Sequence, residues 1–236
     1  MSEQDSNPNP EGIDLRALIR EVEPGLLGDA LARRGEAVVA FATEDLNRIP
    51  RTELREAVIG LLTRAGTELV RLGDAPNDVD RAARAVRNAF EMALILRFAL
   101  HSPENLSHWV RLRVKEEVEI LTSLVKLQPP GHPGTPVIQE HVRQREAFLA
   151  ARGVKMPKGR FNMKDLAQRF GMLTDYEALY GAYSKYIHPS AWTIVKPDDG
   201  FDPMFAAVFV VHAQLYVMDM ANRAAGAMGV SAERVD

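Results

Sequence analysis

The stretch that decides the fold is residues 83–100, which reads ARAVRNAFEMALILRFAL. Between residues 89 and 100 apolar side chains occupy nearly every face of a helix, and such a helix is central in its fold. Asn77 or Asp78 can cap the helix at its start, and we expect it to run to about His101. The sequence therefore predicts a long central helix against which the rest of the chain packs.

The remainder of the chain also shows the apolar spacing of helices, without convincing strand alternation. Further helices are expected over 13–21, 26–49, 53–72, 103–125, 137–151, 163–170, 174–187 and 203–228. Prolines and glycines separate them, most densely in the loop 129–136. We therefore predict an all-α fold, a single-domain multi-helix bundle of about nine helices with no sheet.

The domain organisation is predicted from the composition and from the positions of loops rich in proline and glycine. Of 236 residues, 46% are hydrophobic and 26% are charged, which is ordinary for a soluble globular chain. The loop 129–136 is the candidate domain boundary, but neither side of it looks self-sufficient. We expect a disordered tail over 1–12, a helical bundle domain over 13–228 and a C-terminal tail over 229–236.

Composition also excludes several classes of protein. The chain has no Cys, so it has no disulfide, zinc–thiolate site or Cys nucleophile, and this fits a reducing cytoplasm. A net charge of −3 excludes a globally basic nucleic-acid binder. Residues 1–12 lack the basic start and apolar run of a signal peptide. The most apolar stretch, 204–218, is shorter than the roughly 20 residues that span a bilayer. We expect a cytoplasmic protein without membrane contact.

Two charged residues on the central helix need partners. Glu91 projects among apolar neighbours, where an unpaired carboxylate would cost several kcal/mol or become protonated. Arg87 lies one turn earlier, and the i, i+4 spacing lets it reach Glu91. One interpretation is a structural ion pair. The other is the floor of a polar pocket, with Glu91 as acid, base or ligand anchor.

A second polar cluster follows the helix over 174–187. Four of the five tyrosines lie between 176 and 186, and the stripe that includes Tyr180 and Tyr183 is also typical of a core. Ser184 and His188 lie beside that stripe, and Pro189 stops the helix after His188. His188 is either a cap of the helix end or an acid or base beside these hydroxyls.

The helix that carries Glu91 and the helix that carries the tyrosines should lie side by side, because the polar groups of each need hydrogen-bond partners. Glu91 offers more acceptor sites than Arg87 can fill, and the tyrosine helix brings hydroxyl donors that need partners. We therefore expect Glu91 within hydrogen-bonding reach of Tyr180, Tyr183, Ser184 or His188.

The same two segments resemble a known family. Residues 83–98 and 180–190, which read ARAVRNAFEMALILRF and YGAYSKYIHPS, are similar to the two signature helices of a bacterial helical family of unknown function, family 5677. In that family an Arg…Glu helix and a Tyr-x-x-x-Ser-x-x-x-His-Pro-Ser segment recur. The resemblance implies a helical fold and carries no settled activity.

That family in turn resembles, distantly, the HEPN group of helical nucleotide-binding and ribonuclease domains. Active HEPN ribonucleases carry an Arg a few residues before a His. Here Gly181, Ala182 and Tyr183 occupy those positions before His188, and Arg97 lies closer to His101 than the pattern requires. The chain departs from the nuclease pattern at this point.

Other site signatures are missing from the sequence. No His-x-x-x-His or Glu-x-x-His pair sets two metal ligands on one helix face, so we expect no metal site. Glycine-rich phosphate loops and the Gly-x-Ser-x-Gly elbow are absent, and we expect no cofactor.

A basic stretch is the remaining candidate for binding. Residues 143–164 carry seven Lys or Arg residues against one acidic residue, with Phe161 among them. Arg152, Lys155, Lys158 and Arg160 could track a phosphate backbone, or the stretch could be a solvated loop.

We interpret the chain as a binding or regulatory protein. Its polar pocket would be built from Arg87, Glu91, Tyr180, Tyr183, Ser184 and His188. The alternative is a HEPN-like enzyme acting on RNA or a nucleotide, with His188 as acid or base and Arg87, Glu91 and Ser184 as further catalytic candidates. A third reading is a purely structural or interaction protein. Whether the chain is an enzyme, and whether it forms a homodimer, stay open.

Overall fold

The computed structural model describes residues 24–153, 157, 159, 161–188, 194–195 and 202–235. Its helices are α2 (Pro24–Ala40), α3 (Glu53–Gly73), α4 (Val79–His101), α5 (Pro103–Leu127), α6 (Thr135–Ala150), α7 (Met163–Arg169), α8 (Leu173–Asp175), α9 (Gly181–Ile187) and α11 (Asp202–Met228). These ranges contain no strand, and the prediction of an all-α multi-helix fold is confirmed. The helix expected over 13–21 lies outside the described residues.

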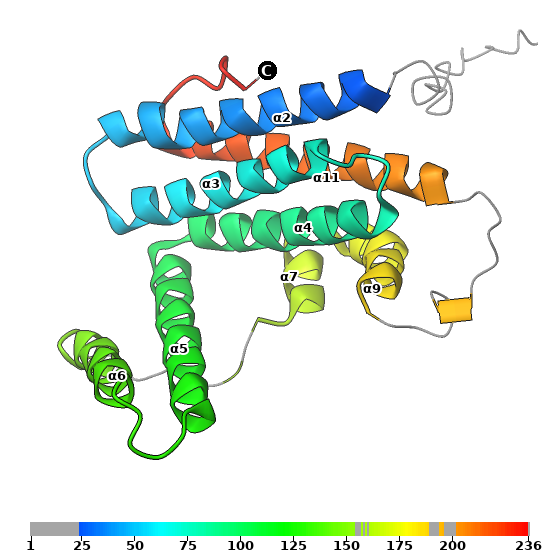
Figure 1. Ribbon diagram of the computed structural model, residues 1–236. Helices are drawn as coiled ribbons and strands as arrows, with labels where there is room; N and C mark the ends of the chain where they lie inside the picture. Colours follow the sequence, from blue (N-terminus) through cyan, green and yellow to red (C-terminus); the bar gives the residue numbers. More distant parts are fainter. Residues whose placement is uncertain are drawn as a thin grey trace, which may run out of the picture.

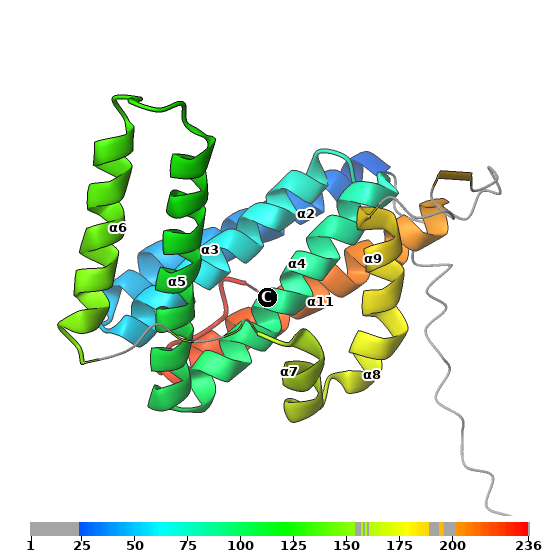
Figure 2. The ribbon, with the colours of Figure 1, turned by 90° about the horizontal axis from the view of Figure 1, so that it is seen from below.

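The helices form a bundle with two additions (Figure 1). Helices α2, α3, α4 and α11 lie alongside one another, and the chain then turns into α5, which leaves the bundle at a steep angle. Helix α6 returns beside α5, and the turned view shows the two as a separate hairpin (Figure 2). Helix α7 packs near the C-terminal end of α4, where Phe170 contacts His101, and α9 packs beside Arg87 and Glu91 nearer its start.

Helix α4 is the centre of the fold, as its apolar composition predicts. Asp78 caps it, since the Asp78 carboxylate accepts hydrogen bonds from the backbone N–H groups of Asp80 and Arg81, both at 3.0 Å. Most of its apolar residues are buried, and it packs against α3, α5, α7, α9 and α11. Every other described part of the bundle is therefore positioned by this helix or by a neighbour of it.

Helices α2 and α3 approach each other at two pairs of glycines. A Cβ built on Gly28 would lie 2.6 Å from the backbone oxygen of Gly73, and one built on Gly35 would lie 2.5 Å from that of Gly66. The reverse distances are 2.7 Å and 2.6 Å. The two contact points are seven residues apart along each of the antiparallel helices, and at both of them the backbones touch where only glycine fits.

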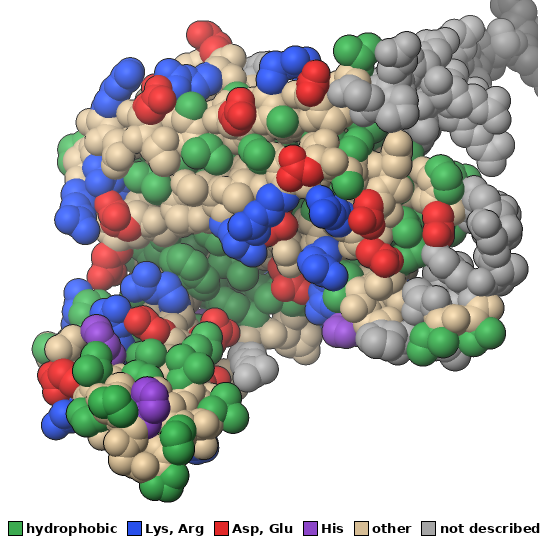
Figure 3. All heavy atoms as spheres, viewed as in Figure 1, with side chains coloured by type: hydrophobic (Ala, Val, Ile, Leu, Met, Phe, Trp, Pro, Cys, Tyr) green, Lys and Arg blue, Asp and Glu red, His purple; other side chains and the backbone are tan. Residues whose placement is uncertain are grey.

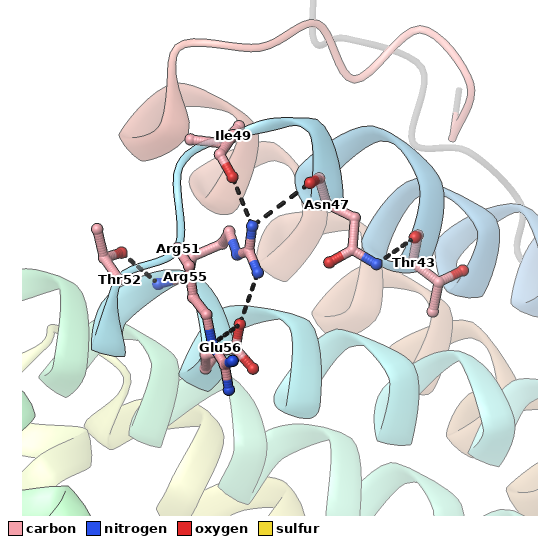
Figure 4. Close-up of polar contacts among 7 residues, drawn as sticks. All are labelled: Thr43, Asn47, Ile49, Arg51, Thr52, Arg55 and Glu56. Atoms are coloured by element: carbon pink, nitrogen blue, oxygen red, sulfur yellow. Dashed lines mark hydrogen bonds and ion pairs between the residues drawn. The ribbon is translucent and has the colours of Figure 1, made fainter.

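The turn between these helices is fastened by a buried arginine (Figure 4). Arg55, near the start of α3, donates from Nη1 to the backbone carbonyl oxygens of Ile49 and, at 3.4 Å, Asn47. Its Nη2 lies 2.7 Å from Glu56 Oε1. The guanidinium satisfies carbonyl groups that are left open at the end of the 3-10 turn η2 (Leu46–Arg48), which precedes α3.

Helix α11 packs against α4 and α3. Among the described residues, it is the one helix long and apolar enough to cross a membrane, judged by length and composition. Phe209, Ala213, Val217 and Met220 are buried in the same cluster as the α4 core. This is the environment of a core helix, in line with the sequence-based expectation for residues 204–218.

The α5–α6 hairpin differs from the rest of the bundle. Leu112 and Val114 are buried at its base on α5, and Leu149 is buried at its base on α6. Between residues 115 and 148 no residue is buried. The hairpin therefore reaches into solvent without a core of its own.

Candidate functional site

Two helices bring the predicted polar residues together. The first half of α4 packs against η3 (Tyr176–Tyr180) and α9, which lie side by side with it in both views (Figures 1 and 2). Arg87 and Glu91 project from α4, and Tyr180 and His188 come from the two ends of α9. We call Arg87, Glu91, Tyr180 and His188 the α4–α9 cluster.

The α4–α9 cluster is connected by direct polar contacts. Arg87 Nε donates to Glu91 Oε1 at 2.9 Å, and the Tyr180 hydroxyl donates to the same oxygen at 2.8 Å. Arg87 Nη1 lies 3.2 Å from His188 Nε2. The prediction that the two helices pack together, with Glu91 bonded to a residue of the tyrosine segment, is confirmed.

Chemistry assigns the protons in these contacts. A guanidinium has no acceptor, so His188 Nε2 accepts from Arg87 and the imidazole in this contact is neutral, with its proton on Nδ1. Burial, reinforced by the bond to Glu91, raises the pKa of Tyr180 to about 12, so its hydroxyl remains a donor. Burial alone would lower the pKa of Arg87, but the hydrogen bond to Glu91 and the electrostatic interactions with Tyr180 and Glu91 together outweigh it, and the pKa is raised.

Aromatic rings pack around Tyr180 and Arg87 of the cluster. The rings of Tyr176 and Tyr180 stack with centroids 4.6 Å apart, and the Arg87 guanidinium lies over the Tyr180 ring at 5.0 Å. Phe90 packs against Tyr180 at 6.0 Å and against Tyr216 at 5.2 Å. These contacts hold Tyr180 in one orientation, and with it the position of the Glu91 carboxylate.

The cluster is reached by solvent. The side chains of Arg87 and Glu91 are 24% and 28% exposed, and His188 is exposed. Glu91 is therefore half-buried, although its neighbours along the helix are apolar. Glu91 lies at the edge of the core, where the short segment η3–α9 covers only one side of it.

The tyrosine segment is not a continuous α-helix. Residues Tyr176–Tyr180 form a π-helical turn between the short α8 and α9. Tyr180 faces Glu91, whereas Tyr183 is fully buried and packs edge-on against Phe209 of α11 at 5.0 Å. The wider turn thus sends neighbouring tyrosines to different helices, and such turns occur often at functional sites.

Tyr183 and Ser184 lie outside the network. The Tyr183 hydroxyl is buried without a hydrogen-bond partner among the described residues, and so is that of Tyr216. Burial, with the neighbouring Tyr216 hydroxyl and then the charge of Asp175 as smaller causes, raises the pKa of Tyr183 far above its usual range. Ser184 is half-buried, and its backbone oxygen accepts the N–H of His188 at 3.2 Å.

The described part of the basic stretch is occupied by local contacts. Arg152 stacks over the Phe148 ring at 3.6 Å and lies 3.6 Å from a carboxylate oxygen of Glu53. Phe161 packs against Phe98 at 5.1 Å, so it is not free to stack on a base. Lys155, Lys158 and Arg160 lie outside the described residues.

Sequence reasoning missed a second polar region. A groove of about 500 Å³ lies between α3 and α4, lined by Arg64, Glu68, Arg71, Arg81 and Arg84 with neighbouring residues. The signal was present as arginines at helical spacing on α3 and α4, but nothing in the sequence pairs the two helices. In the described ranges, no group of three or more His, Asp or Glu side chains is arranged to hold a metal ion.

The fold and the cluster together define a helical bundle with an Arg–Glu–Tyr–His network between two of its helices. A family model described as a family of unknown function (DUF5677) matches residues 61–201, more than half of the chain. The chain belongs to this family, and the match includes every residue of the α4–α9 cluster. No curated protein and no solved structure matches it.

Proposed function

We propose that this chain is a cytoplasmic binding or regulatory protein and that the α4–α9 cluster holds a polar ligand. The observation that carries the proposal is the solvent-reached position of an arginine already oriented by three neighbours. A sealed network would favour a structural role. A guanidinium fixed in place and still open to solvent loses little freedom on binding, and this favours affinity.

The free hydrogen-bonding groups describe the ligand. Glu91 compensates the charge of Arg87, and Tyr180 and His188 are neutral in these contacts, so the cluster carries no net charge. Arg87 has further N–H donors and His188 offers its Nδ1–H, while Glu91 retains acceptor capacity. This set suits a ligand that presents an acceptor and a donor side by side, such as a carboxamide or the edge of a nucleobase.

Native mass spectrometry of the purified protein tests the binding role. We expect an added mass on the wild-type protein that is lost from His188→Asn, because the imidazole is exposed at the mouth of the cluster. His141→Asn on α6 makes the same chemical change at an exposed position far from the cluster, and it should keep the ligand. A species without added mass, combined with a lowered melting temperature for His188→Asn, would support a structural role instead.

A second candidate is an enzyme acting on RNA or a nucleotide. It is favoured by the 3.2 Å contact between Arg87 and His188, because a neutral imidazole can take a proton while a neighbouring arginine binds a phosphate oxygen. Arg87 would have to release His188 for either step.

Cleavage of labelled single-stranded RNA tests this alternative. Activity that His188→Asn abolishes and His141→Asn leaves intact would favour the enzyme. Equal rates for all three proteins, or no cleavage, would remove it.

A further inference from the structure

The groove between α3 and α4 is lined by more positive than negative side chains. Four of the side chains that line it are arginines, two from each helix, against two carboxylates, Glu68 and Asp74. The chain as a whole is acidic, with a net charge of −3. Figure 3 shows Lys and Arg side chains gathered over α3 and α4 on this face.

A buried carboxylate organises the α3 wall. The Glu68 side chain is only 9% exposed, and its Oε1 lies 2.9 Å from Arg64 Nη2 and 3.6 Å from Arg71 Nη1. A buried carboxylate is stable only when it is paired, so Glu68 holds both guanidiniums toward the groove. Arg64 and Arg71 nevertheless remain more than half exposed, and most of their N–H donors are unused.

The α4 wall supplies two freer arginines. Arg81 and Arg84 are three residues apart and therefore lie on one face of the helix. Arg81 has only a 3.7 Å contact with Asp78, and Arg84 has no ion pair among the described residues. Both side chains are exposed toward the groove, without a partner that compensates them fully.

We propose that this groove binds an oligophosphate group, that is, two or three linked phosphates. Arginine is suited to phosphate because its planar fork donates two parallel hydrogen bonds to two oxygens. Four guanidiniums on two walls offer more donors than one phosphate can use, whereas a chain of phosphates can bridge the walls. The volume of about 500 Å³ is within the range of ligand pockets.

The groove recognises the phosphate chain rather than a base. None of the described residues that line it is aromatic, so nothing there can stack on a nucleobase. The ligand chemistry is shared by nucleoside triphosphates and inorganic tripolyphosphate. The inference does not depend on the function proposed for the α4–α9 cluster.

Isothermal titration calorimetry with three anions tests the inference. We expect tripolyphosphate to bind at least about tenfold more tightly than orthophosphate at the same ionic strength, since linked phosphates engage both walls. ATP with an affinity like that of tripolyphosphate identifies the phosphate chain as the whole determinant. ATP that binds more than about tenfold tighter identifies a nucleotide as the source, with the nucleoside held beyond the groove.

Matched variants locate the site. Arg84→Gln removes an unpaired, exposed arginine, so the fold should be unaffected and tripolyphosphate affinity should fall about tenfold. Arg143→Gln on α6 removes the same charge from a distant helix and should change affinity less than about twofold. The proposal is overturned if tripolyphosphate does not bind at low salt, if orthophosphate binds as tightly, or if the two variants weaken binding equally.

Discussion

The chain contains two helical hairpins built on opposite principles. In the α2–α3 hairpin the backbones touch at glycine pairs, Arg55 fastens the turn, and Leu31, Leu62 and Leu69 are fully buried. In the α5–α6 hairpin no residue between 115 and 148 is buried, and Ile120, Leu124 and Leu127 are largely exposed. The helices of both hairpins are comparably long, so helix formation alone does not distinguish them.

The difference shows where the stability of this fold resides. Isolated helices are marginal in water, and most helical stability in proteins comes from packing of an apolar face. The α2–α3 hairpin has that packing against α4 and α11, whereas the α5–α6 hairpin has it only at its base. We expect the first to unfold with the whole domain and the second to open locally at lower free energy.

The largest effect should come from removing a core side chain from α3 and comparing it with the same change on α5. Leu62→Ala should cost about 2–5 kcal/mol of unfolding free energy, because Leu62 is fully buried. Leu121→Ala, at a partly exposed position of the second hairpin, should cost less than about 1 kcal/mol. Urea denaturation measures both, and equal losses would break the comparison.

The glycine contact gives the next largest effect. Gly66→Ala places a Cβ 2.6 Å from the backbone oxygen of Gly35 and should cost about 2 kcal/mol, because the helices must separate. Gly60→Ala on the same helix meets no atom within 4 Å and should stabilise by about 0.5–1 kcal/mol. Thermal melts of the two variants should move in opposite directions, and a Gly66→Ala protein as stable as wild type would show that the contact is not close.

The α4–α9 cluster lies between these extremes, at the edge of the core. Glu91→Leu strands Arg87 and the Tyr180 hydroxyl and should cost about 1 kcal/mol. Glu91→Gln keeps an acceptor and should cost less. The two melting temperatures rank the variants, and a Glu91→Leu protein that melts at or above the wild-type temperature would contradict the network.

The smallest effect concerns the Tyr180 proton. Its pKa of about 12 in the folded chain lies above the usual value of about 10, so the folded state holds this proton more tightly than the unfolded state does. The stabilisation is therefore complete below about pH 10 and is lost as the pH rises toward 12. Tyrosinate absorbance of wild type minus Tyr180→Phe should titrate near pH 12, and a difference centred near 10 would mean that the hydroxyl is free.

Sequence reasoning recovered the helices and much of the cluster for the same physical reason. Both depend on local spacing: the apolar surface of α4, the Asp78 cap and the i, i+4 pair of Arg87 and Glu91 are all visible along the chain. The need of the Glu91 carboxylate for hydrogen-bond donors beyond Arg87 then predicted which helix packs against it.

What sequence reasoning missed depends on contacts between helices. The glycines at 28, 35, 66 and 73 carry a seven-residue spacing on two helices, but their pairing needs the antiparallel register. The π-helical turn that directs Tyr180 and Tyr183 to different helices leaves no mark in the apolar pattern. The burial of Glu68 likewise depends on α4 closing over α3.

The glycine pairs have a consequence for motion. Packed helices usually accommodate a conformational change by sliding, with side chains that shift between rotamers at the interface. At Gly28–Gly73 and Gly35–Gly66 there is no side chain to shift, and a slide would drive the methyl groups of Val39 or Val70 into a backbone that they already approach. We therefore expect α2 and α3 to move together as one rigid body, so that a displacement of α3 at the arginine groove would also displace α2.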